Sequence, residues 1–242
     1  MSNFRKLQDQ KSRQKMKRPF IINFKNYLEV SADHTIRLAK IAEKVADNLG
    51  TEIVIAPPQP SLSAVIQNVK IPVICQHVDD SKIGSTTGFF IPEIAKSYGA
   101  VGSLINHSEH RLDNKAIKNL VERLHRLEMI SIVCAQNAQE VAEVVDLAPD
   151  FIAVEPPELI GSGKSVSKVN PLIIIDSLQA VAKNSTSTKM ICGAGITDKS
   201  DVTSALQLGA DGILVASSIV KATSWSEKIS DLASGFEQLQ VK

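Results

Sequence analysis

The sequence predicts a single α/β domain folded as a closed (β/α)8 barrel. Short runs rich in Val and Ile alternate with longer segments whose apolar residues repeat at a helical spacing, and eight such pairs follow one another between residues 20 and 239. The continuous apolar runs are typical of strands buried on both faces, hence of a parallel sheet covered by helices. Eight strand–helix pairs fit a closed barrel better than an open, doubly wound sheet. No change in composition and no linker divides this stretch into two domains.

Each predicted strand is a short apolar run, and each is followed by its own helix. The strands are expected at residues 20–24, 52–56, 73–75, 101–105, 130–133, 151–154, 189–192 and 212–215. The helices are expected at residues 31–49, 60–67, 91–98, 114–127, 137–147, 171–183, 199–208 and 226–239. Because a helix follows every strand, all eight strands are expected to run parallel.

The composition excludes several classes of protein. With 43% hydrophobic and 22% charged residues, the chain has an ordinary composition for a globular domain. No run of about 18 apolar residues predicts a membrane span, and the N-terminus lacks the apolar core of a signal peptide. Three widely spaced cysteines, Cys75, Cys134 and Cys192, predict neither a disulfide framework nor a zinc cluster, which favours a reducing cytoplasm. They lie near the ends of the third, fifth and seventh predicted strands, where we expect them as small apolar residues of the barrel layers.

The first 19 residues differ from the rest of the chain in charge. They contain seven Lys or Arg residues and one acidic residue, Asp9, although the net charge of the whole chain is only +1. A basic tail can contact nucleic acid or an acidic partner, but this one has a single aromatic residue, Phe4, and no periodic apolar face. We therefore expect a solvated, disordered extension over residues 1–19 and the barrel over residues 20–242.

The stretch that follows the sixth predicted strand is the most informative one. Glu155 comes directly after the strand, Pro156 and Pro157 end it, and Gly161-Ser162-Gly163 provides a loop with few steric restrictions. A carboxylate on a rigid strand end beside a loop that can close is suited to abstracting a proton. The alternative interpretation is a plain strand-to-helix connection with a solvated glutamate.

Two nucleotide-binding patterns are incomplete. Residues 161–165 read Gly-Ser-Gly-Lys-Ser, like the end of a phosphate-binding P-loop, but Glu158 stands where that pattern needs another glycine. Residues 193–195 read Gly-Ala-Gly, like a dinucleotide fingerprint, but Asp198 stands at the third glycine position. Neither segment therefore predicts nucleotide binding.

Polar residues gather where the predicted strands end. Barrel enzymes carry their chemistry at the C-terminal ends of the strands. These positions hold Asn23 and Lys25, His107 and His110 within residues 106–110, Glu155, and the small-residue loops 193–195 and 216–218. Each of these residues could also be an ordinary surface or turn residue without a function. Their placement at the same end of the barrel favours a single functional site.

Four segments resemble the triosephosphate isomerase family in order and spacing, over nearly the whole chain. They are Asn23-Phe24-Lys25, Asn106-His107-Ser108-Glu109, Val154-Glu155-Pro156 with Ile160-Gly161-Ser162-Gly163, and Cys192-Gly193-Ala194-Gly195. The double proline after Glu155 and the short chain are similar to the archaeal type. Two features depart from the family pattern: Ser218 replaces a glycine that is frequent there, and the basic extension has no counterpart.

The resemblance implies interconversion of dihydroxyacetone phosphate and glyceraldehyde 3-phosphate through an enediolate, in glycolysis and gluconeogenesis, with no cofactor and no metal. Glu155 would be the base, His107 a neutral electrophile and Lys25 a source of positive charge. Asn23 would help to place the substrate oxygen, and Glu109 would lie near Lys25. An imidazole N–H and an ammonium are groups that stabilise charge developing on an oxygen.

The resemblance also implies a substrate-binding set and an assembly. The substrate-binding residues would be Asn23, Phe24, Lys25, Ile160, Gly161, Gly195, Ala216 and Ser217. Residues 82–90 resemble the family's interdigitating loop, so Thr87 would contact Asn23 and Glu109 of a second copy in a homodimer or homotetramer. The alternative is an ordinary loop that packs Phe89 and Phe90 on its own helix. No nucleic acid or membrane partner is expected.

Two other functions stay open on the residues alone. Another phosphosugar barrel enzyme, such as an aldolase or a phosphate synthase, would share the glycine-rich loops after the last two strands but would not explain His107 and Glu155. A barrel that only binds phosphorylated ligands would not need Glu155.

Overall fold

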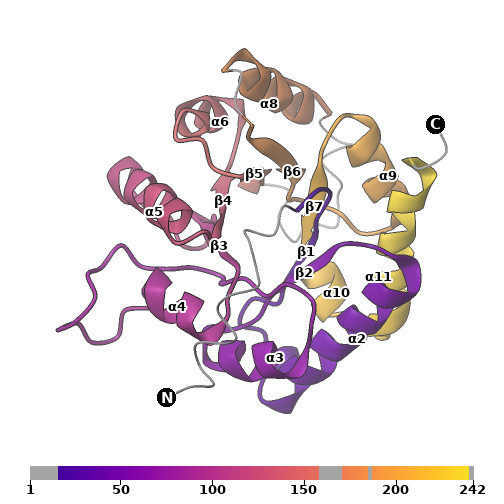
Figure 1. Cartoon of the computed structure of the whole chain (residues 1–242). Helices are drawn as coiled ribbons and strands as arrows, with labels where there is room; N and C mark the ends of the chain where they lie inside the picture. The colour runs from indigo at the N-terminus through magenta and orange to yellow at the C-terminus, as the bar shows by residue number, and fades with distance from the viewer. Residues whose placement is uncertain (1–15, 158–170, 185–186, 240–242) are drawn as a thin grey trace.

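Parallel strands form a curved sheet at the centre of the molecule, and helices surround it (Figure 1). The computed structural model describes residues 16–157, 171–184 and 187–239. In this part of the chain the sheet has seven strands in the order β2-β1-β7-β6-β5-β4-β3. The strands are β1 (Phe20–Asn23), β2 (Ile53–Ala56), β3 (Gly102–Ile105), β4 (Ile130–Ala135), β5 (Phe151–Val154), β6 (Lys189–Cys192) and β7 (Gly212–Val215).

The predicted strand at residues 73–75 closes the barrel, although it forms only isolated bridges. Val73 pairs in parallel with Ile55 of β2, and Cys75 pairs in parallel with Ser103 of β3. Backbone bonds continue on both sides, because the N–H of Ile74 donates to the carbonyl of Ile55 at 2.9 Å. An eighth short strand therefore fills the gap between β2 and β3, which confirms the predicted (β/α)8 barrel.

The barrel has two apolar layers, because alternate residues of each strand point inward and outward. Ile21 of β1 belongs to the inner cluster, whereas its neighbours Phe20 and Ile22 belong to the outer cluster that packs against the helices. The inner cluster is small and consists of Met16, Ile21, Val54, Ala56, Ile74, Leu104, Ile130, Ile132, Cys134, Phe151, Ala153, Ile191 and Leu214. Strands buried on both faces explain why their sequences are apolar throughout.

The helices agree closely with the predicted ones. They are α2 (Asp33–Leu49), α3 (Leu62–Asn68), α4 (Pro92–Tyr98), α5 (Asn114–Arg126), α6 (Ala138–Val145), α8 (Pro171–Lys183), α9 (Lys199–Gln207), α10 (Ser217–Val220) and α11 (Trp225–Ala233). Asp113, Asn137 and Asp198 cap α5, α6 and α9 through their side chains, an interaction that typically contributes about 1 kcal/mol. Some details differ from the prediction. The 3-10 helix η1 (Leu28–Val30) was not expected, and the predicted helix at residues 60–67 begins with the 3-10 helix η2 (Gln59–Ser61). The one-turn helix α10 was not expected, and the last helix passes into the 3-10 helix η4 (Ser234–Leu239).

The barrel begins earlier than the expected boundary at residue 20. Met16 is only 4% exposed and belongs to the inner cluster. The backbone N–H groups of Lys17 and Arg18 both donate to a carboxylate oxygen of Glu52, at 2.8 and 2.9 Å. Residues 16–19 therefore pack on the barrel, whereas the rest of the basic extension lies outside the described residues.

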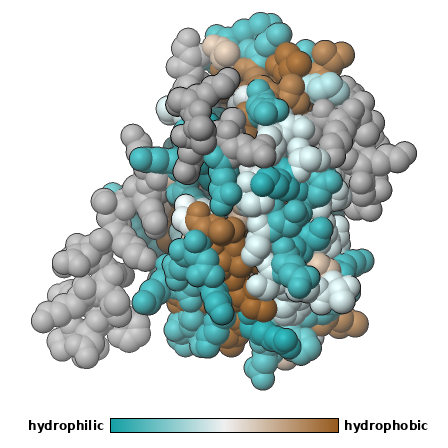
Figure 2. Space-filling view, turned by 90° about the vertical axis from the view of Figure 1, so that its right-hand side faces the viewer, coloured by the Kyte–Doolittle hydropathy of each residue, from teal (hydrophilic) through white to brown (hydrophobic). Residues whose placement is uncertain are grey.

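One face of the molecule is mostly polar (Figure 2). Figure 2 shows a largely hydrophilic or neutral face with a strip of apolar surface near its centre. Within the described residues, no helix has the length and apolar character needed to cross a bilayer. Among the large apolar side chains that are exposed, Ile83 and Phe89 lie on the loop between residues 79 and 90.

Candidate active site

A cavity of about 460 Å³ lies at the C-terminal ends of the strands. It is lined by residues from segments far apart in the sequence, which the barrel brings together. They are Asn23, Lys25, Tyr27, His107, Glu109, Glu155, Gly193, Ala194, Gly195, Ile196, Thr197, Leu214, Val215, Ala216, Ser217, Ser218 and Lys221.

Glu155 is held in the cavity by the two strands beside it. It directly follows β5, and its backbone N–H donates to the carbonyl of Ala135 at 2.8 Å. Gly193 lies against its side chain, because a Cβ added at Gly193 would stand 2.5 Å from the Cγ of Glu155. Only glycine leaves space for the carboxylate here, so Gly193 sets where Glu155 points.

His107 lies opposite Glu155, and its hydrogen bonds assign its tautomer. Its Nδ1 accepts a hydrogen bond from the backbone N–H of Glu109 at 3.2 Å. A ring nitrogen that accepts carries no proton, so the proton of the neutral imidazole is on Nε2. That Nε2 is 3.4 Å from Oε1 of Glu155, and both side chains are almost fully buried. The imidazole therefore presents an N–H donor to the same space as the carboxylate.

The turn that carries His107 has an unfavourable backbone conformation at Asn106, and hydrogen bonds of the Asn106 side chain stabilise it. Asn106 has a φ of +60°, in the left-handed region that Asn tolerates better than most residues. Its side-chain amide donates to the carbonyl of Cys134 at 3.1 Å and accepts from the N–H of Leu112 at 3.0 Å. Both ends of the Asn106 side chain thus hold the segment that positions His107.

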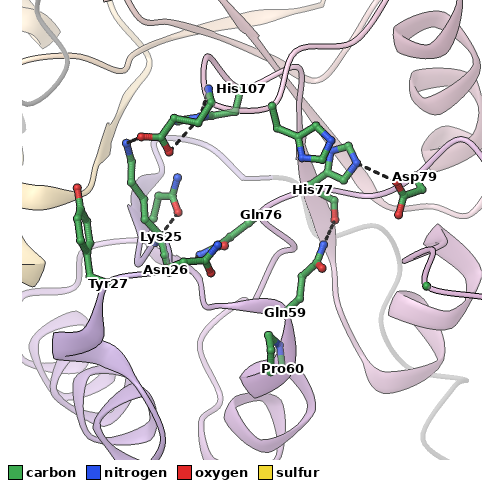
Figure 3. A pocket seen from close by; sticks show the side chains of 13 residues that line it. Lys25, Asn26, Tyr27, Gln59, Pro60, Gln76, His77, Asp79 and His107 are labelled. Atoms are coloured by element: carbon green, nitrogen blue, oxygen red, sulfur yellow. Dashed lines mark hydrogen bonds and ion pairs between the residues drawn. The ribbon is translucent and has the colours of Figure 1, made fainter.

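Lys25 is held in the same way on the other side of the cavity. Its φ of +50° is also in the left-handed region, which costs a residue with a Cβ on the order of 1 kcal/mol. Gln76 donates to its carbonyl at 3.1 Å, and its own N–H donates to Oδ1 of Asn23 at 3.0 Å. Its ammonium lies 2.7 Å from Oε1 of Glu109 (Figure 3).

The arrangement of these groups is chemically suited to removing a proton next to a carbonyl. Oε2 of Glu155 is buried and has no hydrogen-bond partner among the described residues. A buried carboxylate oxygen without a partner is unusual and is available to accept a proton. The N–H of His107 and the ammonium of Lys25 can stabilise the oxygen that becomes negative when the proton leaves.

The loops after β6 and β7 form the other wall of the cavity. Gly195 has a φ of +70°, which lets its backbone turn toward the cavity. The hydroxyl of Ser218 donates to the carbonyl of Ile196 at 2.9 Å and so joins the two loops. Lys228 supports the first loop by donating to the carbonyl of Thr197 at 3.0 Å.

Comparisons with known proteins agree with this geometry. The model of the family described as triosephosphate isomerase matches residues 19–232. A triosephosphate isomerase of Cenarchaeum symbiosum is 46% identical over 213 residues, which are 88% of this chain and 95% of that protein. The enzyme of the same name from Methanothermus fervidus is 43% identical over 218 residues, which are 90% of this chain and 98% of that protein.

The chain belongs to the triosephosphate isomerase family. The resemblance inferred from the four sequence segments is therefore confirmed. So is its archaeal type, since these relatives, and a third from Methanocaldococcus jannaschii at 43% identity over 88% of this chain and 97% of its own, are archaeal.

Most residues that the family resemblance assigns to the site line this one cavity. They are Asn23, Lys25, His107, Glu109, Glu155, Gly195, Ala216 and Ser217. The structure does not bring Phe24 and Thr87 into it: Phe24 is fully buried in the outer cluster, and Thr87 lies on the exposed loop between residues 79 and 90. Ile160 and Gly161 lie outside the described residues.

The three cysteines are buried in the barrel layers, as expected, but in two different layers. Cys134 belongs to the inner cluster, whereas Cys75 and Cys192 pack in the outer one. Burial raises the pKa of the Cys75 and Cys192 thiols to about 12. Burial, together with the Glu155 carboxylate, also raises the pKa of the Cys134 thiol. All three thiols stay protonated near neutral pH, so none is suited to act as a nucleophile.

The sequence alone assigns no role to Gly193, Gln76, Tyr27 or Lys221. Gly193 belongs to the segment Cys192-Gly193-Ala194-Gly195, but its contact with Glu155 joins two strands and is not visible in one segment. Gln76 directly follows the short strand 73–75, and its side chain bonds to Lys25. Since barrel enzymes carry functional residues at the C-terminal ends of their strands, its position in the sequence could have identified it. Tyr27 and Lys221 lie past the strand ends, where no local pattern distinguishes them.

A second cavity of about 740 Å³ adjoins the first and shares Asn23, Lys25, Tyr27, His107 and Glu109 with it. Figure 3 shows the side chains that line this second cavity. Its wall includes two stacked imidazoles, His77 and His110, with ring centroids 3.7 Å apart. Burial lowers the pKa of His77, the nearby His110 lowers it further, and only the hydrogen bond and charge of Asp79 oppose this. His77 is therefore neutral near pH 7, which allows the two rings to stack without repulsion.

Proposed function

We propose that the chain interconverts dihydroxyacetone phosphate and D-glyceraldehyde 3-phosphate, as a triosephosphate isomerase of glycolysis and gluconeogenesis. The observation that carries this proposal is the pairing of a buried carboxylate with a neutral N–H donor, Glu155 Oε1 and His107 Nε2, which lie 3.4 Å apart. The family membership supports the same substrates, because the relatives carry the name triosephosphate isomerase.

The reaction needs only proton transfers. Glu155 removes a proton from C1 of dihydroxyacetone phosphate, and the C–H electrons form the C1–C2 double bond of an enediolate. His107 donates its Nε2 hydrogen bond to the oxygen on which charge develops, while the hydroxyl proton of O1 moves to O2. Glu155 then returns a proton to C2, and C1 becomes the aldehyde carbon.

The remaining site residues bind and orient the substrate. Lys25 brings a positive charge to the oxygens of the substrate, and Asn23 fixes the backbone of Lys25. Glu109 holds the ammonium of Lys25 in place. We assign the phosphate to backbone amides of Gly195, Ala216 and Ser217, together with Ile160 and Gly161, and we assign Phe24 only the role of anchoring the Asn23–Lys25 segment.

The test is a triose phosphate isomerase assay on the wild type and on Glu155→Gln, with Glu143→Gln as the matched surface control. Glu155→Gln keeps the size of the side chain but cannot accept the proton, so turnover should fall by at least about 100-fold. Binding of inorganic phosphate should be unchanged. Full activity of Glu155→Gln contradicts the assignment of the base, and a wild type without isomerase activity contradicts the function itself. A wild type that only binds phosphate would be a non-catalytic barrel.

We further propose that the functional unit is a homo-oligomer in which the loop between Asp79 and Phe90 enters the second cavity of another copy. Asp79 ties the two ends of this loop together: its carboxylate accepts from the N–H of Phe90 at 2.6 Å, and its own N–H donates to the carbonyl of Phe90 at 2.8 Å. Phe90 packs on the outer cluster, whereas its neighbour Phe89 is 56% exposed. An exposed aromatic on a protruding loop is suited to an interface.

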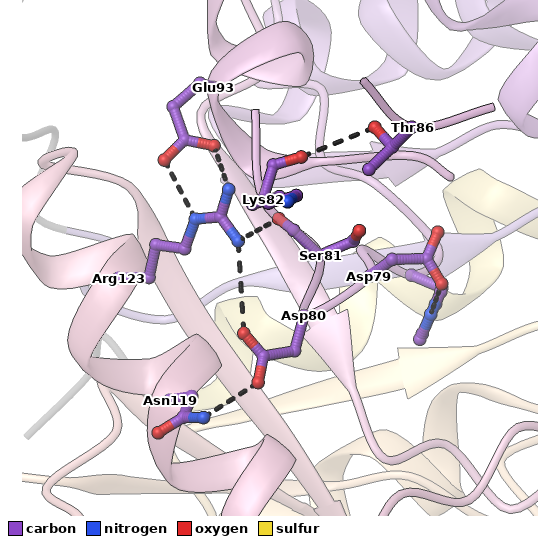
Figure 4. Close-up of polar contacts among 9 residues, drawn as sticks. Asp79, Asp80, Ser81, Lys82, Thr86, Glu93, Asn119 and Arg123 are labelled. Carbon is purple, nitrogen blue, oxygen red and sulfur yellow. Dashed lines mark hydrogen bonds and ion pairs between the residues drawn. The ribbon is translucent and has the colours of Figure 1, made fainter. Parts of the chain in front are cut away.

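Arg123 of α5 supports the base of this loop (Figure 4). Its guanidinium donates to the carbonyl of Ser81 at 2.6 Å and to both carboxylate oxygens of Glu93, at 2.8 and 2.5 Å. The hydrogen bonds from Arg123 lower the pKa of Glu93, so the pair stays ionised near neutral pH. A loop held at its base loses less conformational freedom when it binds, which supports its role as an inserted element.

We place the enzyme in the cytoplasm. All three cysteines are free and buried in the barrel layers. Structural thiols that are not paired are typical of proteins from a reducing compartment.

A further inference from the structure

The two lysines of the cavity differ in what surrounds their charges. The ammonium of Lys25 is 2.7 Å from Oε1 of Glu109. The ammonium of Lys221 lies over the ring of Tyr27, 4.6 Å from its centroid. No carboxylate within the described part of the chain forms a salt bridge with Lys221. The charge of Lys25 is thus largely compensated by a neighbouring carboxylate, whereas that of Lys221 is not.

Lys221 lines the cavity together with Gly195, Ala216 and Ser217, the residues to which the phosphate is assigned. It follows α10 directly, and its backbone N–H donates to the carbonyl of Ser217 at 3.0 Å. Tyr27 follows β1, which pairs with β7, and lies two residues beyond Lys25. Both side chains line the cavity that contains Glu155, so their contact joins two neighbouring segments of its wall.

We propose that Lys221 is a substrate-binding residue that recognises the phosphate dianion, and that Tyr27 positions it. The proposal rests on the proposed isomerase function and adds a residue to it. A dianionic substrate must bind beside the carboxylate of Glu155, and such a charge is unfavourable unless nearby cations offset it. Lys221 supplies a cation that forms no salt bridge with a carboxylate of the described residues, at the end of the cavity proposed for the phosphate.

Tyr27 explains how an exposed lysine can act as a defined part of the site. An aromatic face attracts an ammonium without cancelling its charge, unlike a carboxylate. The ring therefore restrains the lysine over the cavity and leaves its full charge for the ligand. The interaction needs the ring and not the hydroxyl, which gives the proposal a specific consequence: Tyr27→Phe should preserve it and Tyr27→Leu should not.

The experiment compares a phosphorylated substrate with the same substrate lacking phosphate. We would measure kcat/KM for D-glyceraldehyde 3-phosphate and for D-glyceraldehyde, and the dissociation constant of inorganic phosphate, in Lys221→Gln, Lys221→Arg, Tyr27→Phe and Tyr27→Leu. Lys40→Gln is the control, because Lys40 is exposed on α2, lines neither cavity and changes the net charge equally.

Lys221→Gln should lower kcat/KM for the phosphorylated substrate by about tenfold and weaken phosphate binding by a similar factor, as expected for the loss of one nearby unit charge. Its kcat/KM for D-glyceraldehyde should not change. In Lys221→Arg and Tyr27→Phe, kcat/KM should stay within about twofold of the wild type. Tyr27→Leu should lose part of its kcat/KM, again only with the phosphorylated substrate. Lys40→Gln should have no effect.

Three results would overturn the proposal. The first is wild-type kinetics in Lys221→Gln. The second is an equal loss of kcat/KM on both substrates in Lys221→Gln, which would show that Lys221 only supports the structure. The third is a loss of kcat/KM in Lys221→Arg as large as in Lys221→Gln. The measurement of phosphate binding distinguishes failure of this proposal from failure of the proposed isomerase function. If the wild type did not isomerise triose phosphates, a selective loss of phosphate affinity in Lys221→Gln would still identify the phosphate site.

Discussion

The cavity around Glu155 and the protruding loop between Asp79 and Phe90 fix their functional side chains in different ways. In the cavity, backbone hydrogen bonds and close packing hold Glu155 and His107, which are almost fully buried. In the loop, Asp79 and Arg123 hold the base, and Thr86 bonds to the carbonyls of Lys82 and Gly84 within the loop, while Thr87 and Phe89 are exposed.

The difference shows which parts of the site one copy completes by itself. Chemical groups that must be placed within a fraction of an ångström lie on strand ends, where the barrel determines their position. The exposed part of the loop is held by local bonds from Thr86 to the carbonyls of Lys82 and Gly84, and not by a strand end. Its order and its effect on the site are therefore expected to depend on a second copy, and the following variants test this distinction.

Glu155→Asp should have the largest effect. The shorter side chain withdraws the carboxylate by roughly 1 Å from a site whose backbone cannot follow, and a displacement of this size can cost on the order of 100-fold in kcat. Steady-state kinetics should show the loss in kcat with little change in KM. Unchanged kcat would remove Glu155 from the role of base.

His107→Gln should lower kcat by about 100-fold, because an amide polarises the substrate oxygen less well and cannot exchange a proton. His110→Gln is the matched control. His110 is only three residues away but stacks on His77 in the second cavity, so its replacement should change kcat by less than about threefold. The reverse order in the same assay would show that His110 is the electrophile.

Gly193→Ala tests whether packing, and not only the strand end, positions the base. The added Cβ would lie 2.5 Å from Cγ of Glu155, so the carboxylate must shift, and we expect kcat to fall by about 30-fold. Circular dichroism and thermal unfolding should show that the barrel is retained. A fully active and stable variant would mean that Glu155 has room to move.

Thr87→Arg changes the loop tip and leaves every residue of the cavity intact. An unpaired cation buried in an interface costs several kcal/mol, so the oligomer should dissociate, and kcat/KM should fall by about tenfold, equivalent to about 1.4 kcal/mol of transition-state stabilisation. Sedimentation should be measured beside the kinetics. A fully active monomer would show that each barrel completes its own site.

Arg123→Gln should have the smallest effect. It removes the contacts with Glu93 and Ser81 at the base of the loop but leaves the loop tip unchanged. Ion pairs with this degree of exposure typically contribute up to about 1 kcal/mol, so oligomer affinity should weaken by about fivefold at most, with normal kcat in the assembled enzyme. A loss of kcat at saturating protein concentration would show that the loop base acts directly on the site.

Much of the fold and the site follows from the sequence alone. The alternation of apolar runs and helical segments predicted all eight strands and the order of the helices, because these patterns depend on local periodicity. The positions of Lys25, His107 and Glu155 directly after strands predicted that they would meet, because parallel strands of a barrel end on one side.

Tertiary structure decided what depends on register and on contacts between distant segments. Cys134 faces inward while Cys75 and Cys192 face outward, because a shift of one residue along a strand reverses the side to which a side chain points. Residues 16–19 read as part of a charged tail, yet they pack on the barrel because Glu52 accepts two of their N–H groups. The contacts of Gly193 with Glu155 and of Lys221 with Tyr27 join elements that are adjacent only after the barrel closes.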